Sequence, residues 1–190
     1  VDRVIVVGAG PVGLLTALRL GQAEIWVDVL EQNENLCERP RAAGYYAAAL
    51  LALEKARVLD SAGKAGFTTQ GLYWRKPLTD GVGGAKRLGD VIARLGFPEG
   101  TGVSGALILP QSELAKVLFD EAVATGFVKV HFGRDLSAIQ EKGNSVLATA
   151  RTPDSTEESF QGSFLVGADG GKSMTRRLLG IPFKGYSWPE

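Results

Sequence analysis

The sequence predicts an α/β fold in which helices cover a parallel sheet and a small antiparallel meander is added. Three observations predict this fold class. An apolar strand at residues 4–7 leads through a glycine-rich turn into a helix and then into a second apolar strand. An amphipathic helix begins near residue 111 and is followed by a further strand. Three short strands separated by turn residues then precede another buried strand at 164–167.

The first half of the chain contains the more regular elements. Residues 4–7 are wholly apolar and β-branched, as in a strand buried on both faces, and they are followed by a predicted helix over 12–20 and a strand over 25–30. Alanine and leucine dominate residues 42–55, which predicts a helix that continues towards residue 59 and ends before residue 63. The glycine-rich stretch 66–109 has no long period, so we expect loops and short strands there.

The second half begins with a predicted helix over residues 111–125, for which Ser112 is the expected N-cap. A strand is expected at 128–131, and it holds His131, the only histidine, which we interpret as a structural residue. The meander strands are expected at 136–140, 145–150 and 158–160, followed by the strand at 164–167 and a helix over 173–179.

The amino-acid composition limits the binding partners, the metal sites and the cellular compartment that we expect. The 190 residues are 45% hydrophobic, and 21 basic side chains balance 21 acidic ones. This balance predicts no nucleic-acid partner. The longest apolar run, residues 45–53, is too short for a bilayer, so we expect no membrane span. Cys37 is the only cysteine, which excludes an internal disulfide, predicts no multi-cysteine metal site, and indicates a reducing, cytoplasmic compartment.

The glycines after the first strand have the spacing of a dinucleotide-binding turn. Gly8 permits a tight turn, Gly10 allows the backbone to approach a pyrophosphate, and Gly13 lets the helix pack closely on the strand. Glu31 ends the second strand, where a carboxylate accepts hydrogen bonds from ribose hydroxyls and repels a 2′-phosphate. The pattern therefore predicts a Rossmann-like site for FAD or NAD. The candidate residues in this half are Gly8, Gly10, Pro11, Gly13, Glu31 and Gln32.

Further motifs distinguish FAD from NAD, because they resemble a known family. An arginine-containing stretch occupies residues 39–44, a glutamine-led helix begins at Gln111, and an Asp-Gly motif lies within 167–173 with Arg176 behind it. In this order, and together with the glycine turn, the chain resembles the FAD-dependent aromatic hydroxylases. These enzymes are class A flavoprotein monooxygenases of the p-hydroxybenzoate hydroxylase type, and the resemblance covers essentially the whole chain.

The resemblance implies roles for the later candidate residues. Arg41 would lie beside the flavin diphosphate and ribityl region, with the Ala42 backbone near the ring. Gln111 would contact the ribityl or pyrophosphate segment of FAD. Asp169 and Gly170 would touch FAD and help to bind the nicotinamide cofactor. A guanidinium suits a diphosphate, and an acid among glycines suits ribose or ribityl hydroxyls.

The same resemblance implies an activity and a domain plan. It implies an enzyme that binds FAD and uses NADPH or NADH with O2 to hydroxylate a small aromatic, phenolic molecule. Residues 1–182 would form the FAD-binding domain, with 66–109 inserted near the substrate side, and 183–190 would begin a substrate domain. The third flavin motif of the family, a Gly-Asp-Ala-Ala-His stretch, does not occur here, so we expect an N-terminal portion of a longer enzyme. The sequence identifies no catalytic residue and no oligomeric state.

Two other kinds of protein share the glycine turn. One is another FAD- or NAD-dependent oxidoreductase, such as a flavin disulfide reductase or a dehydrogenase. The single cysteine argues against the reductase, and the Arg41 stretch together with the Asp169 motif argues against the dehydrogenase. The other is a non-catalytic dinucleotide-binding domain. If the purified longer protein released no flavin on denaturation, the dehydrogenase or the non-catalytic domain would be favoured.

Overall fold

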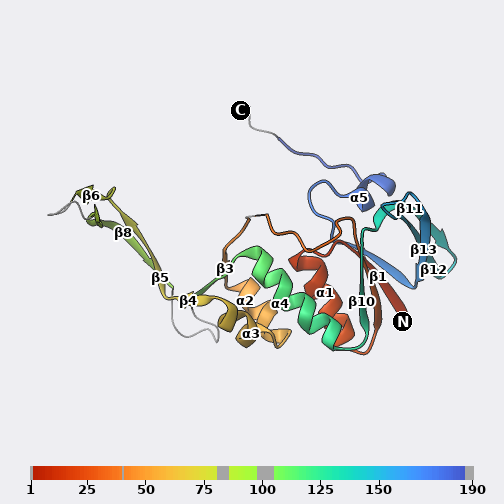
Figure 1. The fold of residues 1–190 in the computed structure, drawn as a ribbon, viewed down its shortest axis with the longest axis horizontal. Coiled ribbons are helices and arrows are strands. Elements are labelled where there is room, and N and C mark those ends of the chain that lie inside the picture. Colours follow the sequence, from red (N-terminus) through yellow and green to blue (C-terminus); the bar gives the residue numbers. More distant parts are fainter. Residues whose placement is uncertain (1, 40, 81–85, 98–104, 187–190) are drawn as a thin grey trace. The chain divides into compact units, whose positions relative to one another are not determined.

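A computed structural model describes residues 2–39, 41–80, 86–97 and 105–186 (Figure 1). The chain divides into two compact units. The first unit consists of Val1–Pro40 and Gln111–Glu190, and the second unit is Arg41–Pro110. The sequence predicted one FAD-binding domain over 1–182, and this boundary stays a prediction.

A four-stranded parallel sheet forms the centre of the first unit. Its strand order is β10-β2-β1-β14, and each neighbouring pair is parallel. The apolar side chains of β1 and most of those of β2 are buried, as predicted for strands covered on both faces. The predicted parallel sheet is therefore confirmed. The strands are β1 (Arg3–Val7), β2 (Trp26–Glu31), β10 (Val128–Phe132) and β14 (Phe164–Gly167).

Two long helices lie side by side in this unit, α1 (Pro11–Gly21) and α4 (Gln111–Ala124) (Figure 1). Each helix leads into a strand of the parallel sheet, so each runs against the strand direction and begins at the carboxyl edge of the sheet. The prediction of Ser112 as an N-cap is wrong. The helix begins at Gln111, directly after Pro110, and Ser112 therefore lies inside its first turn.

The predicted meander is present on one face of the sheet. Its strands are β11 (Asp135–Lys142), β12 (Ser145–Arg151) and β13 (Glu157–Gly162), joined as two antiparallel pairs. Ile5, Val7 and Leu30 of the parallel sheet form one buried cluster with apolar side chains of the meander. This shared core fixes the meander on the sheet. After β14 comes the short helix α5 (Met174–Leu178).

The second unit consists of short strands and two short helices. Strands β3 (Gly44–Tyr46), β9 (Ala106–Ile108) and β4 (Phe67–Thr69) form one sheet in that order. Strands β5 (Gly71–Arg75) and β8 (Val91–Gly96) form an antiparallel pair, and between them in the sequence β6 (Thr79–Asp80) pairs with β7 (Lys86–Arg87). The prediction of short strands within 66–109 is confirmed where the structure describes it; 81–85 and 98–104 lie outside the described residues.

The helix predicted from residue 42 towards residue 59 is partly wrong. Gly44–Tyr46 within it form β3, and helix α2 covers only Ala48–Lys55, with α3 (Leu59–Ala65) following as a separate helix that contains Gly63. Helix α2 ends because Arg57 takes a left-handed conformation, with φ of 59°. The Arg57 amide donates to the Glu54 carbonyl, and the Val58 amide donates to the Leu53 carbonyl. These bonds form a Schellman motif, which usually carries glycine at the position of Arg57.

None of the helices in the described residues is long and apolar enough to cross a membrane.

One carboxylate lies inside the parallel sheet of the first unit. Asp28 of β2 is only 4% exposed, and its two oxygens pair with His131 at 2.7 Å and with Arg3 at 2.5 Å. Burial opposes the charged form of Asp28, but hydrogen bonds from His131 and Arg3 outweigh it and lower the pKa of Asp28. The interpretation of His131 as a structural residue agrees with this arrangement.

We expect the Asp28→Asn substitution to lower the free energy of unfolding by about 1–3 kcal/mol at pH 7. Because the folded-state pKa of Asp28 is lowered, its charge stabilises the fold above its unfolded pKa of about 3.9. That contribution is lost as the pH falls through the folded-state pKa. Urea denaturation of both proteins should therefore show a stability difference that is full at neutral pH and shrinks below about pH 4. Asp90→Asn is the control, because its pair with Lys76 is exposed, and a difference independent of pH would contradict the assignment.

Candidate functional site

The turn after β1 requires glycine at two positions for steric reasons. Gly8 has φ of 103°, and a Cβ there would lie 2.7 Å from the carbonyl oxygen of Ala168. A Cβ on Gly13 would lie 1.9 Å from the carbonyl oxygen of Gly8. The Gly8 amide donates to the Leu30 carbonyl at 2.8 Å. The turn is therefore packed between the first turn of α1 and the loop after β14, with no room for a side chain at Gly8 or Gly13.

Gly10 differs from these two glycines because it borders open space. A Cβ on Gly10 would meet no atom within 4 Å, and its φ of −75° is accessible to any residue. Gly10 is also the N-cap of α1, Pro11 takes the first helical position, and no side chain caps this end. The first turn contains no acidic residue. This helix end therefore offers backbone N–H groups and the positive end of the helix dipole to an anion.

Glu31 closes the site at the end of β2, where it is only 9% exposed. Its Oε2 accepts a hydrogen bond from the Ala9 amide at 2.8 Å, and its Oε1 accepts one from the Asn33 amide at 3.0 Å. The side-chain amide of Asn33 also donates to Oε1. These bonds hold the carboxylate against the glycine turn. An acid beside a helix N-terminus suits recognition of a diol next to a diphosphate.

The Asp-Gly motif after β14 reaches the same turn. The Ala168 amide donates to the Val7 carbonyl at 2.8 Å, which joins the ends of β14 and β1. Asp169 accepts from the Ser173 hydroxyl at 2.6 Å and from the Thr175 amide at 2.9 Å. Burial opposes ionisation of Asp169, but these hydrogen bonds outweigh it and lower the pKa of its carboxyl group. Gly170 follows with φ of 76°, exposed and with open space at its Cα.

Several predicted residues thus meet at the carboxyl edge of the parallel sheet. The glycine turn, Glu31 and the Asp169 motif follow β1, β2 and β14 in turn. Gln111 is half-buried at the first position of α4, whose N-terminus points to the same edge. In open α/β sheets, ligands bind at this edge. An adenine dinucleotide fits here, because Gly10 leaves space for a diphosphate and Glu31 provides a fixed acceptor for ribose hydroxyls.

Comparison with known proteins decides between the dinucleotides. A profile of the FAD binding domain matches residues 2–188. The chain belongs to the FAD-binding domain family. This membership confirms the resemblance stated from the motifs and identifies FAD as the cofactor. It also agrees with the mixed α/β architecture described above.

Relatives of this FAD-binding domain are monooxygenases. The 6-hydroxy-3-succinoylpyridine 3-monooxygenase HspB of Pseudomonas putida is 34% identical over 191 residues, an alignment that covers all of this chain and 46% of the relative. The para-nitrophenol 4-monooxygenase of a Pseudomonas species is 28% identical, with 45% of its length covered. The chain therefore spans less than half the length of these curated relatives.

Solved structures that resemble this chain are also of monooxygenases and hydroxylases. The p-nitrophenol 4-monooxygenase PnpA of Pseudomonas putida superposes with a TM-score of 0.84 at 26% identity, covering 99% of this chain and 46% of that one. Aklavinone-11 hydroxylase, solved with FAD and aklavinone, superposes with a TM-score of 0.73 at 28% identity, covering 94% of this chain and 35% of that one. The fold predicted from the sequence is that of FAD-dependent hydroxylases.

The remaining candidates of the FAD-binding domain are more exposed. Gln32 is exposed directly after β2. Arg41 and Ala42 are exposed at the start of the second unit, in a segment without regular structure, where the Ala43 carbonyl accepts from the Leu109 amide. The direct contacts of all candidate residues with FAD stay predictions.

Sequence reasoning did not identify the residues that hold the acidic groups in place. Asn33 fixes Glu31 with its backbone and side-chain amides, and Ser173 binds Asp169 while capping α5 through the Arg176 amide. A weak signal exists for each. Asparagine two residues after a strand-end acid, and serine four residues after an aspartate, are positions from which short side chains form local hydrogen bonds.

Proposed function

We propose that this FAD-binding domain belongs to a flavin-dependent monooxygenase that hydroxylates a small aromatic, phenolic molecule with NAD(P)H and O2. The observation that carries the proposal is similarity over the whole chain to proteins named as monooxygenases of hydroxylated or nitrated aromatic rings. The arrangement of Gly10 and Glu31 also supports it, because these residues suit the binding of FAD, the cofactor that such chemistry needs. None of these similarities favours a non-catalytic dinucleotide-binding domain.

The residues of this chain would bind and orient the cofactor. Bound FAD supplies the redox chemistry, since it takes electrons from a reduced nicotinamide and passes them to dioxygen. The α1 N-terminus and Gly10 would receive the diphosphate, and Glu31 would accept hydrogen bonds from the adenosine ribose. Arg41 would neutralise part of the diphosphate charge, and Gln111 would contact the ribityl or pyrophosphate segment.

The co-substrate and the location are further parts of the proposal. NADPH or NADH would be the electron donor, and Asp169 and Gly170 would contribute to its binding. A cytoplasmic location is supported by Cys37, the only cysteine, whose thiol is free and exposed. We expect the 190-residue chain by itself to bind FAD weakly and to lack turnover, because the resemblance assigns further flavin contacts to another motif.

The test uses the full-length protein purified with its bound cofactor. We expect FAD to be released on denaturation and NAD(P)H and O2 consumption to rise when a phenolic compound is added. The product should carry one oxygen atom derived from isotopically labelled dioxygen. Bound NAD without flavin would instead identify a dehydrogenase. Bound FAD without oxygen transfer to any member of a phenol panel would contradict the proposed monooxygenase activity.

A further inference from the structure

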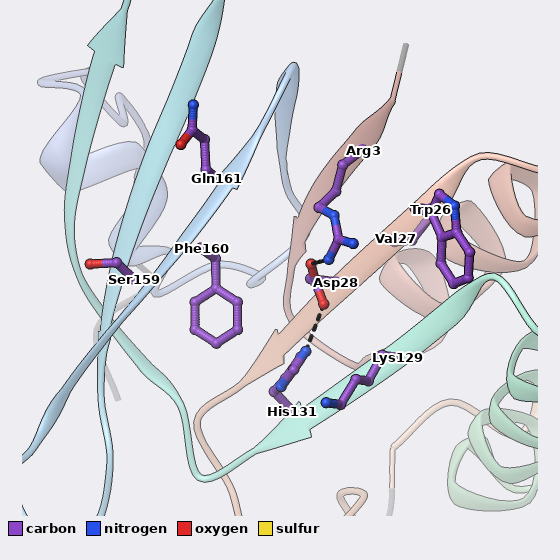
Figure 2. A pocket seen from close by; sticks show the side chains of 9 residues that line it. All are labelled: Arg3, Trp26, Val27, Asp28, Lys129, His131, Ser159, Phe160 and Gln161. Atoms are coloured by element: carbon purple, nitrogen blue, oxygen red, sulfur yellow. Dashed lines mark hydrogen bonds and ion pairs between the residues drawn. The ribbon is translucent and has the colours of Figure 1, made fainter.

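A second cleft lies away from the dinucleotide site, between the parallel sheet and strand β13 of the meander (Figure 2). Its volume is about 450 Å³, within the range of small-molecule sites. Strands β1, β2 and β10 provide its polar floor, and Phe160 of β13 forms part of its wall. The lining residues used below are Arg3, Trp26, Asp28, Lys129, His131 and Phe160.

The acidic group of this cleft is already neutralised by the protein. Figure 2 shows Arg3 and His131 directed at Asp28, and each oxygen of the carboxylate accepts one of these bonds. Asp28 is ionised at neutral pH, so the Nε2 atom of His131 must carry the proton that it donates. Asp28 therefore has little capacity left to attract a cation from solution.

The cationic groups of the cleft are accessible. The Arg3 side chain is 46% exposed although one of its nitrogens binds Asp28. Lys129 is exposed and lies in register with Asp28 on the neighbouring strand. Among the described residues, no hydrogen bond or ion pair of the Lys129 side chain is found. The two permanent cations, Arg3 and Lys129, outnumber the single carboxylate of Asp28, so the cleft has a net positive charge that favours an anion.

Aromatic side chains provide the apolar part of the cleft. The Phe160 ring meets His131 edge-on at 4.8 Å between ring centroids. Trp26 is half exposed and packs against Phe127 with centroids 5.1 Å apart. Flat apolar surfaces of this kind pack well against a planar ring. Cations beside aromatic walls are complementary to a planar molecule that carries an acidic group.

The cleft is separate from the dinucleotide site. Asp28 shares its register and its face with Ile5, which packs against the meander, whereas α1 and α4 cover the other face. Along β2, Asp28 also lies three residues before Glu31, a distance of roughly 10 Å. A molecule bound here would contact the amino-terminal halves of the strands, remote from the edge where FAD binds.

We propose that this cleft binds a small planar organic anion, such as an aromatic carboxylate, through Lys129 and Arg3 with its ring between Trp26 and Phe160. The inference does not depend on the proposed monooxygenase activity, because it concerns a different face of the sheet. The ligand would act as an effector or a structural ligand of the first unit. Its negative group is required for binding, since the cations provide the specificity and the aromatic walls alone provide little.

The test follows quenching of tryptophan fluorescence in the full-length, FAD-loaded protein during titration with para-nitrobenzoate. The uncharged para-nitrobenzamide is the matched ligand control. We expect the carboxylate to bind at least tenfold more tightly than the amide. Lys129→Gln should weaken carboxylate binding about tenfold, whereas Lys142→Gln, an exposed lysine on β11, should leave it unchanged. Trp26→Phe should remove the quenching while keeping an aromatic wall.

The possible results separate this cleft from other sites. Equal binding of the carboxylate and the amide would overturn the proposed anion site. Wild-type affinity in the Lys129→Gln protein would do the same, because it would place the ligand elsewhere. Quenching that persists in the Trp26→Phe protein would locate the ligand near another tryptophan.

Discussion

Replacing Glu31 with alanine is expected to weaken FAD binding by about ten- to several-hundred-fold, which corresponds to a few kcal/mol at most. The carboxylate would supply charge-assisted hydrogen bonds to the ribose, and it is positioned for this by the Ala9 and Asn33 amides. Its loss removes the acceptor for the ribose and also leaves the Ala9 amide without its partner. Glu31→Gln keeps the size of the side chain and one acceptor oxygen, so its effect should be smaller.

The measurement is a titration of the full-length apoprotein with FAD, followed by the Michaelis constant for NADPH in flavin-saturated enzyme. We expect the FAD affinity to fall and the Michaelis constant to change little. Glu34→Ala is the matched control, because this glutamate is exposed in the loop that follows Glu31. If the affinity for the nicotinamide cofactor falls while FAD binding stays constant, Glu31 belongs to a different nucleotide site.

The βαβ unit was predictable because its signals are local. The strand at 4–7, the glycine spacing and the terminal acid lie within a short stretch, and the structure places them as β1, the turn and the end of β2. The meander was predictable for the same reason: Gly143, with φ of 59°, makes a tight turn between β11 and β12, and buried residues alternate along β12. In both cases a glycine at a turn position allows the positive φ that the backbone adopts there.

Features that depend on tertiary structure, or on a backbone conformation that the residue type does not indicate, were not predictable. The pairing of Asp28 with His131 joins residues 103 positions apart, and it arises only from the register of β2 and β10. The end of α2 was missed because Arg57 occupies a left-handed position that glycine usually marks. Around the cofactor site, the sequence indicated the acids but not Asn33 and Ser173, whose short hydrogen bonds depend on local backbone geometry.

The glycine turn allows packing to be separated from cofactor binding with two single substitutions. Gly13→Ala should lower the free energy of unfolding by about 3 kcal/mol or more, because the new methyl group would lie 1.9 Å from the Gly8 carbonyl oxygen. The new Cβ and the Gly8 carbonyl are both fixed to the backbone, so the clash is relieved only by moving α1 or the turn. Urea denaturation of the apoprotein measures this loss without any contribution from FAD. A variant as stable as the wild type would show that the helix is not packed on the turn as described.

Gly10→Ala is the matched substitution, because the methyl group at this position would meet no protein atom within 4 Å. Its φ of −75° suits alanine, so we expect the free energy of unfolding to change by less than about 1 kcal/mol. The same methyl group would nevertheless stand where the diphosphate approaches the N-terminus of α1. The affinity for FAD should therefore fall at least about tenfold in a protein of nearly unchanged stability. Wild-type FAD affinity in the Gly10→Ala protein would show that the diphosphate does not bind at this helix end.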